Sequence, residues 1–387
     1  MLIKCKNCLL DSNIEEIKFD EHGVCNCCNS MSYNIEKKQL FNSEFNKKKL
    51  NKLISKIQQT KNKDGYNCVL GMSGGVDSSY LAHLCDKHNL NPLVAHFDNG
   101  WNTIESISNI ENIISKLNFD LHTFVMDWEE FKDLQLAYLK ASVIDIEIPT
   151  DQLIFAALNK IAAKNNIKFI LSGFNLTSEG VMPLSWIYSG KFDLVNLRNI
   201  HKKFGETKLK KLPKFGKFQQ HWYYSVKGIS TIKILNYVNY NKNSAKSLLK
   251  KTYGWKDYGG KHCESIFTRF YQSYILPQKF GVDKRRAHLS SLIGSNQITK
   301  KEALEELKSP ILNPKTISDD KEYVLKKLNL TEQEFKKIMK TPIISHRFYG
   351  TDDALFYKVL FFIYRAMWFI PIKLFRFLKI IHTPIND

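Results

Sequence analysis

The stretch Cys68-Val-Leu-Gly-Met-Ser-Gly-Gly-Val-Asp-Ser-Ser-Tyr80 decides the fold of this 387-residue chain. Its pattern predicts a short apolar strand, a loop from Ser73 to Ser79 and then an amphipathic helix, because apolar residues recur at helical spacing from Tyr80 onward. Gly74 and Gly75 allow the loop backbone to pass close to a ligand. The helix start beyond them offers free N–H groups and the positive end of the helix dipole, which together favour a phosphate.

The side chains of this glycine loop (residues 73–79) indicate a magnesium–phosphate site. Asp77 is placed to hold a Mg²⁺ ion that bridges phosphate oxygens. No lysine follows the glycines, so the loop is not of the Walker type. It resembles the SGGxDS loop of the ATP-pyrophosphatase superfamily, which implies cleavage of ATP between its α- and β-phosphates and activation of a substrate oxygen by AMP. The expected ATP-binding residues in the loop are Ser73, Gly74, Gly75, Asp77, Ser78 and Ser79.

The net charge of the chain is +19, from 57 basic and 38 acidic side chains. This charge is compatible with a phosphate-rich substrate, with RNA or with an anionic membrane surface, and it does not choose among them. We find no secretory signal and no uncharged apolar run near the ~18 residues that a membrane-spanning helix needs. We therefore expect a cytoplasmic protein, in a compartment where cysteines are more often metal ligands or thiols than disulfides.

A cysteine-rich module is expected in residues 1–35. Cys5-x-x-Cys8 and Cys25-x-x-Cys28 have the spacing of two zinc knuckles. The segment is too short to fold on a core of its own, which is the usual reason for a structural metal. Four thiolates would close a tetrahedral zinc site without an open position, so we expect a structural zinc ribbon. Cys27 is an alternative ligand.

Strands alternate with helices through residues 66–200, after a solvated connecting helix in residues 36–65. Apolar runs predict strands at 92–97, 121–126 and 168–171 in addition to the strand before the glycine loop. This alternation implies an α/β fold with a doubly wound parallel sheet. Ligands of such sheets lie beyond the carboxyl ends of the strands. We therefore add Phe97, Asp98 and Gly173 to the expected ATP-binding residues.

Residues 201–340 are expected to form a mainly helical region with the substrate and pyrophosphate site. Residues 201–258 interleave lysines with aromatics, which fits either a nucleic-acid surface or a solvated face with aromatics packed beneath it. A helix beginning near His262 would carry a polar face where a core face should be apolar, and a basic cluster follows at residues 283–288. Besides Asp77, the candidates for catalysis are Lys261, His262, Glu264, Arg269, Lys284, Arg285 and His288.

The glycine loop, the four-cysteine module and the sequence GGKHCESIFTRFYQSYILPQKFGVDKRRAHLSSLI at residues 259–293 resemble the N-acetyl sugar amidotransferases of bacterial lipopolysaccharide and O-antigen synthesis. This resemblance implies conversion of an N-acetyl group on a nucleotide-activated sugar into an acetamidino group. It also implies a glutaminase subunit and a cyclase-like subunit, relatives of the imidazole glycerol phosphate synthase pair, that supply ammonia. ATP would adenylate the acetamido oxygen, ammonia would displace AMP, and His262, Glu264 or His288 would shuttle protons.

Two other functions stay open. A tRNA-modifying enzyme of the same superfamily, of the lysidine or thiolating type, would suit the charge and the zinc module, although the sugar reading leads us to expect no nucleic-acid partner. A non-catalytic zinc-ribbon binding protein with a vestigial nucleotide loop is the third reading.

The tail, residues 341–387, is dense in aromatic and basic residues between 354 and 381, which fits a helix docked on the body or on a partner, or a helix peripheral to the inner membrane.

Overall fold

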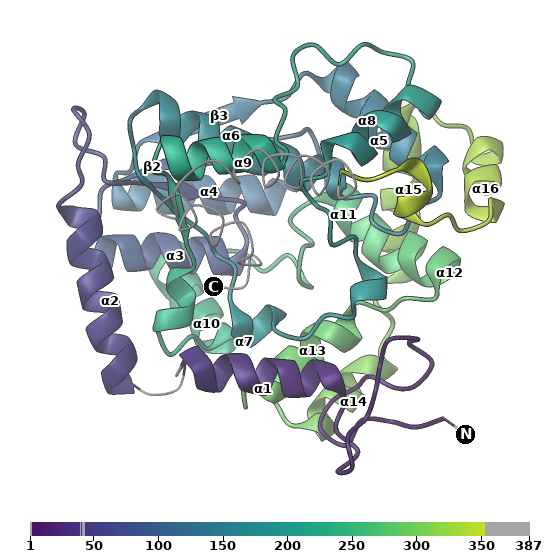
Figure 1. Ribbon diagram of the computed structural model, residues 1–387, viewed down its shortest axis with the longest axis horizontal. Coiled ribbons are helices and arrows are strands. Elements are labelled where there is room, and N and C mark those ends of the chain that lie inside the picture. Colours follow the sequence, from purple (N-terminus) through teal and green to yellow (C-terminus); the bar gives the residue numbers. More distant parts are fainter. Residues whose placement is uncertain (1, 39, 41–42, 353–387) are drawn as a thin grey trace, which may run out of the picture.

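The computed structural model describes residues 2–38, 40 and 43–352. Five parallel strands form one sheet in the order β3-β2-β1-β4-β5, with helices around it (Figure 1). The direction in which strands are added reverses between β1 and β4, so the carboxyl ends of these two strands flank a topological switch point. The strands are β1 (Cys68–Gly71), β2 (Pro92–Asp98), β3 (Leu121–Val125), β4 (Phe169–Leu171) and β5 (Ser230–Ile232).

Helices cover both faces of the sheet because successive strand residues point to opposite sides. Leu70 of β1 is buried with helices α3 (Val76–Lys87), α4 (Ile104–Leu117) and α10 (Lys242–Tyr253). Its neighbour Val69 is buried in a separate cluster with α6 (Ile148–Lys164). The expected α/β class with a parallel sheet is therefore confirmed.

The four predicted strands and the helices between them are present, and the helix bounds follow from local signals. Thr103 caps α4, and Asp127 caps α5 (Trp128–Ala141), each accepting a backbone N–H three residues later. Pro149 lies in the first turn of α6, where its missing N–H costs nothing. Strand β5 lies in the basic, aromatic stretch and has three residues, too few for a periodic pattern.

The carboxyl-terminal half is mainly helical and packs with α5 and the cysteine-rich segment in one large buried cluster. It comprises α11 (Ile266–Phe270), the π-helical turn η4 (Tyr271–Ile275), α12 (Leu276–Phe280), α13 (Arg285–Gly294), α14 (Lys300–Lys308), α15 (Pro314–Leu328), α16 (Glu332–Lys340) and the 3-10 turn η5 (His346–Tyr349). The remaining elements are α1 (Asn26–Lys38), α2 (Ser43–Gln58), α7 (Leu176–Glu179), η1 (Leu184–Trp186), α8 (Leu194–Phe204), α9 (Lys217–His221), the π-helical turn η2 (Trp222–Val226) and η3 (Ile234–Tyr237).

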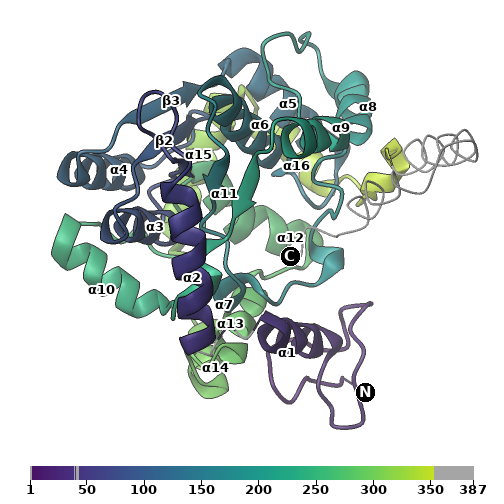
Figure 2. The same ribbon diagram turned by 60° about the vertical axis from the view of Figure 1, so that its left-hand side comes forward.

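The amino-terminal module lies against α13 and α14 (Figure 2). Leu9 N donates to Ser290 Oγ at 3.1 Å, and the Arg286 guanidinium donates to Leu9 O at 2.7 Å. Arg286 also pairs with Asp11 at 2.7 Å. Lys300 Nζ donates to the backbone carbonyl of Cys5 at 2.6 Å. These polar contacts dock the module on the helical half of the chain.

None of the helices in the described ranges is long and apolar enough to cross a membrane. The aromatic and basic segment 354–381, for which the sequence fits a docked or a membrane-surface helix, lies outside the described residues.

Candidate functional site

The glycine loop connects the carboxyl end of β1 to α3 and is closed by its own serines. Gly75 N donates to Ser73 Oγ at 3.3 Å. Ser73 N donates to Ser78 Oγ at 3.3 Å, and Ser78 Oγ donates to Gly75 O at 3.1 Å. These bonds fix the loop before any ligand arrives. Ser79 is fully buried, and its hydroxyl has no hydrogen-bond partner in the described part of the chain.

Gly74 is held against helix α4. Its φ of +78° favours glycine, and a Cβ atom there would lie 2.3 Å from the carbonyl oxygen of Ser106. The Gly74 carbonyl accepts the Asn109 side-chain amide at 3.3 Å and the Trp255 indole N–H at 3.1 Å. The loop is therefore fixed both by α4 and by the segment that follows α10.

Asp77 stands in the first turn of α3, at the switch point between β1 and β4. Its carboxylate accepts the hydroxyl of Tyr240 and the side-chain amide of Asn175 at 3.4 Å. Gly173, just beyond β4, lies so close that a Cβ atom there would be 3.2 Å from Ser78 N. Strand β4 and the start of α3 thus approach each other because residue 173 has no side chain.

Lys261 reaches this carboxylate from the carboxyl-terminal half of the chain. Its side chain is 8% exposed, and Nζ lies 2.7 Å from Glu179 Oε1 and 3.8 Å from Asp77 Oδ2. Nζ also donates to Ser178 Oγ at 3.0 Å. Burial opposes the charge of Lys261, but Glu179 and Asp77 outweigh burial and raise its pKa. The ammonium is therefore charged at neutral pH between two carboxylates.

His262 lies in a turn, with a φ of +63°, and not on the helix that the sequence predicts to begin there. Helix α11 begins only at Ile266, because Ser265 caps it. The imidazole is 39% exposed, with Nε2 4.0 Å from Glu179 Oε1 and Nδ1 3.9 Å from Glu264 Oε1. The prediction of a helix that begins near His262 and carries a polar face is therefore wrong.

A second histidine accompanies His262. The ring of His288, on α13, lies 5.7 Å from the ring of His262. Burial and the charge of Lys261 lower the pKa of both imidazoles well below the usual value. Both rings are therefore neutral at neutral pH, and each can accept a proton.

Glu264 joins the glycine loop to the helical half. Its Oε1 accepts Ser73 Oγ at 3.5 Å, whereas its Oε2 is buried without a hydrogen-bond partner among the described residues. Burial raises the pKa of this carboxyl. Its backbone carbonyl accepts Thr103 N at 3.0 Å, and Ser265 bridges Asn102. The segment 261–265 is thus fastened to the β2–α4 connection.

Two predicted cations are held by ion pairs within the helical half. Arg269 forms a two-pronged pair with Asp320 of α15, with both N–O distances 2.7 Å. Arg285 pairs with Asp283 at 2.8 Å and donates to a carbonyl beyond α14 at 2.9 Å. Lys284 lies 5.8 Å from the centre of the Tyr271 ring. The Arg269 pair therefore joins α11 to α15, and the hydrogen bond of Arg285 joins α13 to the end of α14. Neither ion pair includes a residue of the glycine loop.

The carboxyl end of β2 forms its own polar turn. Asp98 Oδ1 accepts Gly100 N at 2.8 Å and the Asn102 side-chain amide at 3.2 Å. Phe97 stacks on Phe124 of the neighbouring strand, with ring centres 6.1 Å apart. These contacts organise the rim next to the glycine loop.

Four side chains of the site are absent from the sequence-based candidates. Asn175 and Glu179 follow the carboxyl end of β4, so strand position could have identified them. Tyr240 comes from the basic, aromatic stretch and reaches Asp77 across 163 residues, and no local signal identifies it. Tyr258, whose hydroxyl accepts Val76 N at 3.1 Å, lies 182 residues from that partner in the sequence.

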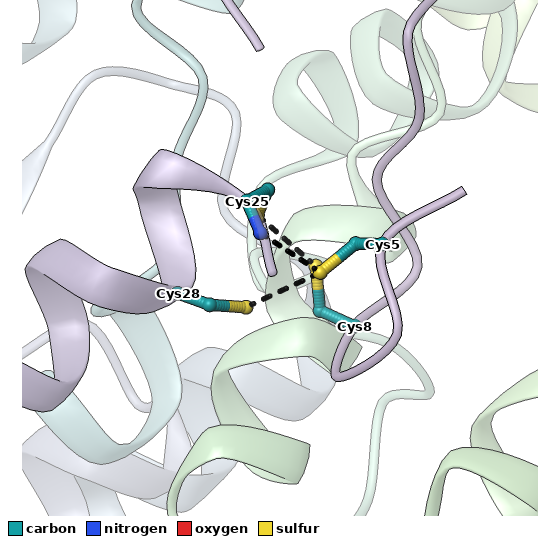
Figure 3. Close-up of side chains that lie close together, drawn as sticks. All are labelled: Cys5, Cys8, Cys25 and Cys28. Atoms are coloured by element: carbon teal, nitrogen blue, oxygen red, sulfur yellow. Dashed lines mark hydrogen bonds between the residues drawn. The ribbon is translucent and has the colours of Figure 1, made fainter. Parts of the chain in front are cut away.

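The four cysteines of the amino-terminal module converge, and their sulfurs point toward one another (Figure 3). The ligand atoms of Cys5, Cys8, Cys25 and Cys28 lie within 4.8 Å of one another. The Cys8–Cys25 and Cys5–Cys28 sulfur distances are 3.6 and 3.9 Å. A tetrahedral site with Zn–S bonds of about 2.3 Å requires about 3.8 Å between sulfurs. This cluster could hold a structural zinc, and Cys27 lies outside it.

Comparison with known proteins finds two partial similarities. Residues 264–363 match the family of LPS biosynthesis protein WbpG-like, C-terminal domain. The chain is also 30% identical over 134 residues to the uncharacterized protein MJ1599 of Methanocaldococcus jannaschii, which covers 34% of this chain and 46% of that protein. The chain thus spans less than half the length of this relative. The WbpG-like match suggests a biosynthetic enzyme with a role in lipopolysaccharide biosynthesis.

Proposed function

We propose that this protein is an ATP-dependent amidotransferase that converts an N-acetyl group of a nucleotide-activated sugar into an acetamidino group, with release of AMP and pyrophosphate. The observation that carries the proposal is the meeting of the glycine loop with Lys261, His262 and Glu264 at the carboxyl end of β1. The WbpG-like match begins within this segment, at residue 264, and favours a sugar substrate over RNA.

The glycine loop and its neighbours suit the phosphates of ATP. Tyr258 presents a hydroxyl oxygen to Val76 N at the start of α3, where a phosphate oxygen of ATP would take its place. Lys261 would stabilise the charge that develops on the departing pyrophosphate. Asp77 and the buried oxygen of Glu264 that has no hydrogen-bond partner among the described residues are the hard ligands that Mg²⁺ prefers. A magnesium ion held there would neutralise phosphate charge.

The reaction needs activation of a poor leaving group. The acetamido oxygen would attack the α-phosphorus of ATP and expel pyrophosphate, and the nitrogen of ammonia would then add to the imidate carbon. The bond from that carbon to the AMP oxygen would break, so that nitrogen replaces oxygen. His262 and His288 are neutral and adjacent, and either can accept the proton that nitrogen loses. Ammonia would come from a glutaminase subunit through a cyclase-like subunit, as the sequence resemblance implies.

The test is a mass-spectrometric assay with ATP, Mg²⁺, ammonium and a panel of nucleotide-activated N-acetylated sugars. We expect AMP, pyrophosphate and a product about 1 Da lighter than the sugar, because oxygen is replaced by NH. Asp77→Asn should abolish the product, whereas Glu129→Gln, at an exposed surface ion pair, should leave it unchanged. AMP formation that requires added tRNA, with no amidine from any sugar, would refute the proposal.

A tRNA-modifying enzyme is the second candidate, because the structure exposes aromatic side chains within the basic stretch. Phe218, Trp222 and Tyr224 on α9 and η2 are 77%, 45% and 51% exposed. Exposed rings beside lysines can stack on the bases of single-stranded RNA. Binding of tRNA that weakens steeply with salt, and that is lost in Trp222→Ala, would support this alternative.

A further inference from the structure

A row of apolar side chains lies exposed on α9 and η2. Phe218, Trp222 and Val226 follow one another at intervals of four residues, so their side chains lie along one side of this helical segment. Their exposed fractions are 77%, 45% and 58%. Apolar residues that are exposed singly need no explanation, but a contiguous row marks a surface that binds another apolar group. We call these three residues the apolar stripe.

The inner side of the same segment is already occupied, so a rotation of the helix cannot bury the apolar stripe. Phe215, just before α9, is buried, and its ring centre lies 5.2 Å from that of Phe192 and 6.2 Å from that of Tyr223. Phe155 of α6 packs on the same cluster. These rings fix which side of α9 and η2 faces the body, and the apolar stripe is left on the outside.

The described chain ends beside the apolar stripe. Asp352 Oδ1 lies 2.6 Å from Nζ of Lys217, which is the first residue of α9 and the neighbour of Phe218. Asp352 N also donates to Asp193 Oδ2 at 3.0 Å. These two contacts fix the point from which the rest of the chain continues, and that point adjoins the apolar stripe.

The sequence that continues from this point is strongly apolar. Residues 354–370 read ALFYKVLFFIYRAMWFI, in which Lys358 and Arg365 are the charged residues, and Pro371 follows. As a helix this segment would be about 25 Å long, and the apolar stripe spans about 12 Å, so the segment is long enough to cover the stripe. The WbpG-like match continues to residue 363, so the matched domain includes the beginning of this segment.

We propose that residues 354–370 dock on the apolar stripe of the same chain. Docking removes apolar surface of the segment and of the stripe from water, which is favourable for both. The attachment at Asp352 gives the segment an effective concentration on the order of millimolar at the stripe, which favours it over a second molecule. A covered stripe leaves its rings no access to RNA, so this contact opposes the tRNA alternative. It does not depend on the amidotransferase reaction.

Photocrosslinking in the full-length protein tests this contact with little disturbance. The photoreactive residue p-benzoylphenylalanine replaces Phe218, and mass spectrometry identifies the crosslinked peptides after irradiation. We expect a crosslink to residues 354–370 within one chain, at the mass of a monomer. The matched control places the same probe at Tyr33 of α1, which is 62% exposed, and should give no crosslink to that segment. A crosslink to a second copy or to copurified RNA, or no crosslink to residues 354–370, would overturn the proposal.

Tryptic cleavage of the full-length protein gives a second readout. Trypsin cleaves after lysine and arginine, so cleavage at Lys358 and Arg365 reports whether the segment is accessible. Trp222→Asp places a charge in the apolar stripe, and we expect it to speed cleavage at both sites about tenfold, because docking protects them. Tyr33→Asp, on α1, should leave both rates unchanged. Equal rates in the wild type and in Trp222→Asp would contradict docking. Protection of the wild type that requires anionic phospholipid vesicles would assign the segment to a membrane surface and also overturn the proposal.

Discussion

Replacing Gly74 by alanine tests the close approach between the glycine loop and α4. The new Cβ atom would lie 2.3 Å from the Ser106 carbonyl oxygen, which is backbone and cannot rotate away. The φ of +78° costs a non-glycine residue about 1–2 kcal/mol, and overpacking adds about 1–3 kcal/mol. We expect Gly74→Ala to lower the free energy of unfolding by about 3 kcal/mol.

The matched control is Gly228→Ala. Gly228 has a φ of +65°, and a Cβ atom there would meet nothing within 4 Å. This variant therefore bears only the backbone cost, about 1–2 kcal/mol. Denaturant unfolding of both variants isolates the steric contribution, and calorimetric titration with ATP measures the effect on the loop. We expect ATP affinity to fall at least tenfold in Gly74→Ala and to stay unchanged in Gly228→Ala.

The reasoning is refuted if the two variants lose the same free energy of unfolding within about 0.5 kcal/mol. That result would mean that α4 yields to the new methyl group or that the loop is not packed against it. A loss of ATP binding without a difference in stability would also contradict the packing argument, because the clash acts on the folded loop itself.

Three further predictions concern other parts of the molecule. Lys261→Met leaves Glu179 and Asp77 without their shared cation, and we expect ATP–pyrophosphate exchange to fall at least ~100-fold, with partial rescue by Lys261→Arg; full activity of the methionine variant would exclude the proposed role. Chelation of zinc should lower the melting temperature and expose the contact between Leu9 and Ser290 to hydrogen exchange, whereas protection that survives metal removal would contradict a metal-dependent module. Burial lowers the pKa of His346 to about 4, so as the pH falls from about 6.5 to about 4 the unfolded chain gains a proton that the folded chain excludes. Stability should then decrease by about 1.4 kcal/mol per pH unit, and urea unfolding of His346→Gln should lack this increment of slope.

The sequence predicts the sheet and the glycine loop well, because both follow from local patterns. Apolar runs of four to seven residues specify β1 and β2, and the capping residue Thr103 specifies where α4 begins. The four-cysteine cluster was equally predictable from the sequence, since the spacing of the cysteines is itself typical of zinc ligands. In these parts each signal and its structural consequence lie within a few residues.

The candidate site was only partly readable, because its members meet across long stretches of chain. The polar spacing after Gly260 indicates a helix at His262, but Ser265 is the better cap and His262 takes a left-handed turn. Tyr240 carries no local mark of its role. Its position depends on how helical segments pack on the sheet, which no periodicity in the sequence records.

The docking of the amino-terminal module has a consequence for the order of events during synthesis. Leu9 emerges from the ribosome early, but its partner Ser290 follows 281 residues later. At about 5–20 residues per second, the module waits roughly 14–56 s before α13 can receive it. During that interval metal binding by the cysteines can keep the segment compact, since α13 and α14, on which it docks, do not yet exist. Zinc supply at the time of translation would then set the yield of native chains.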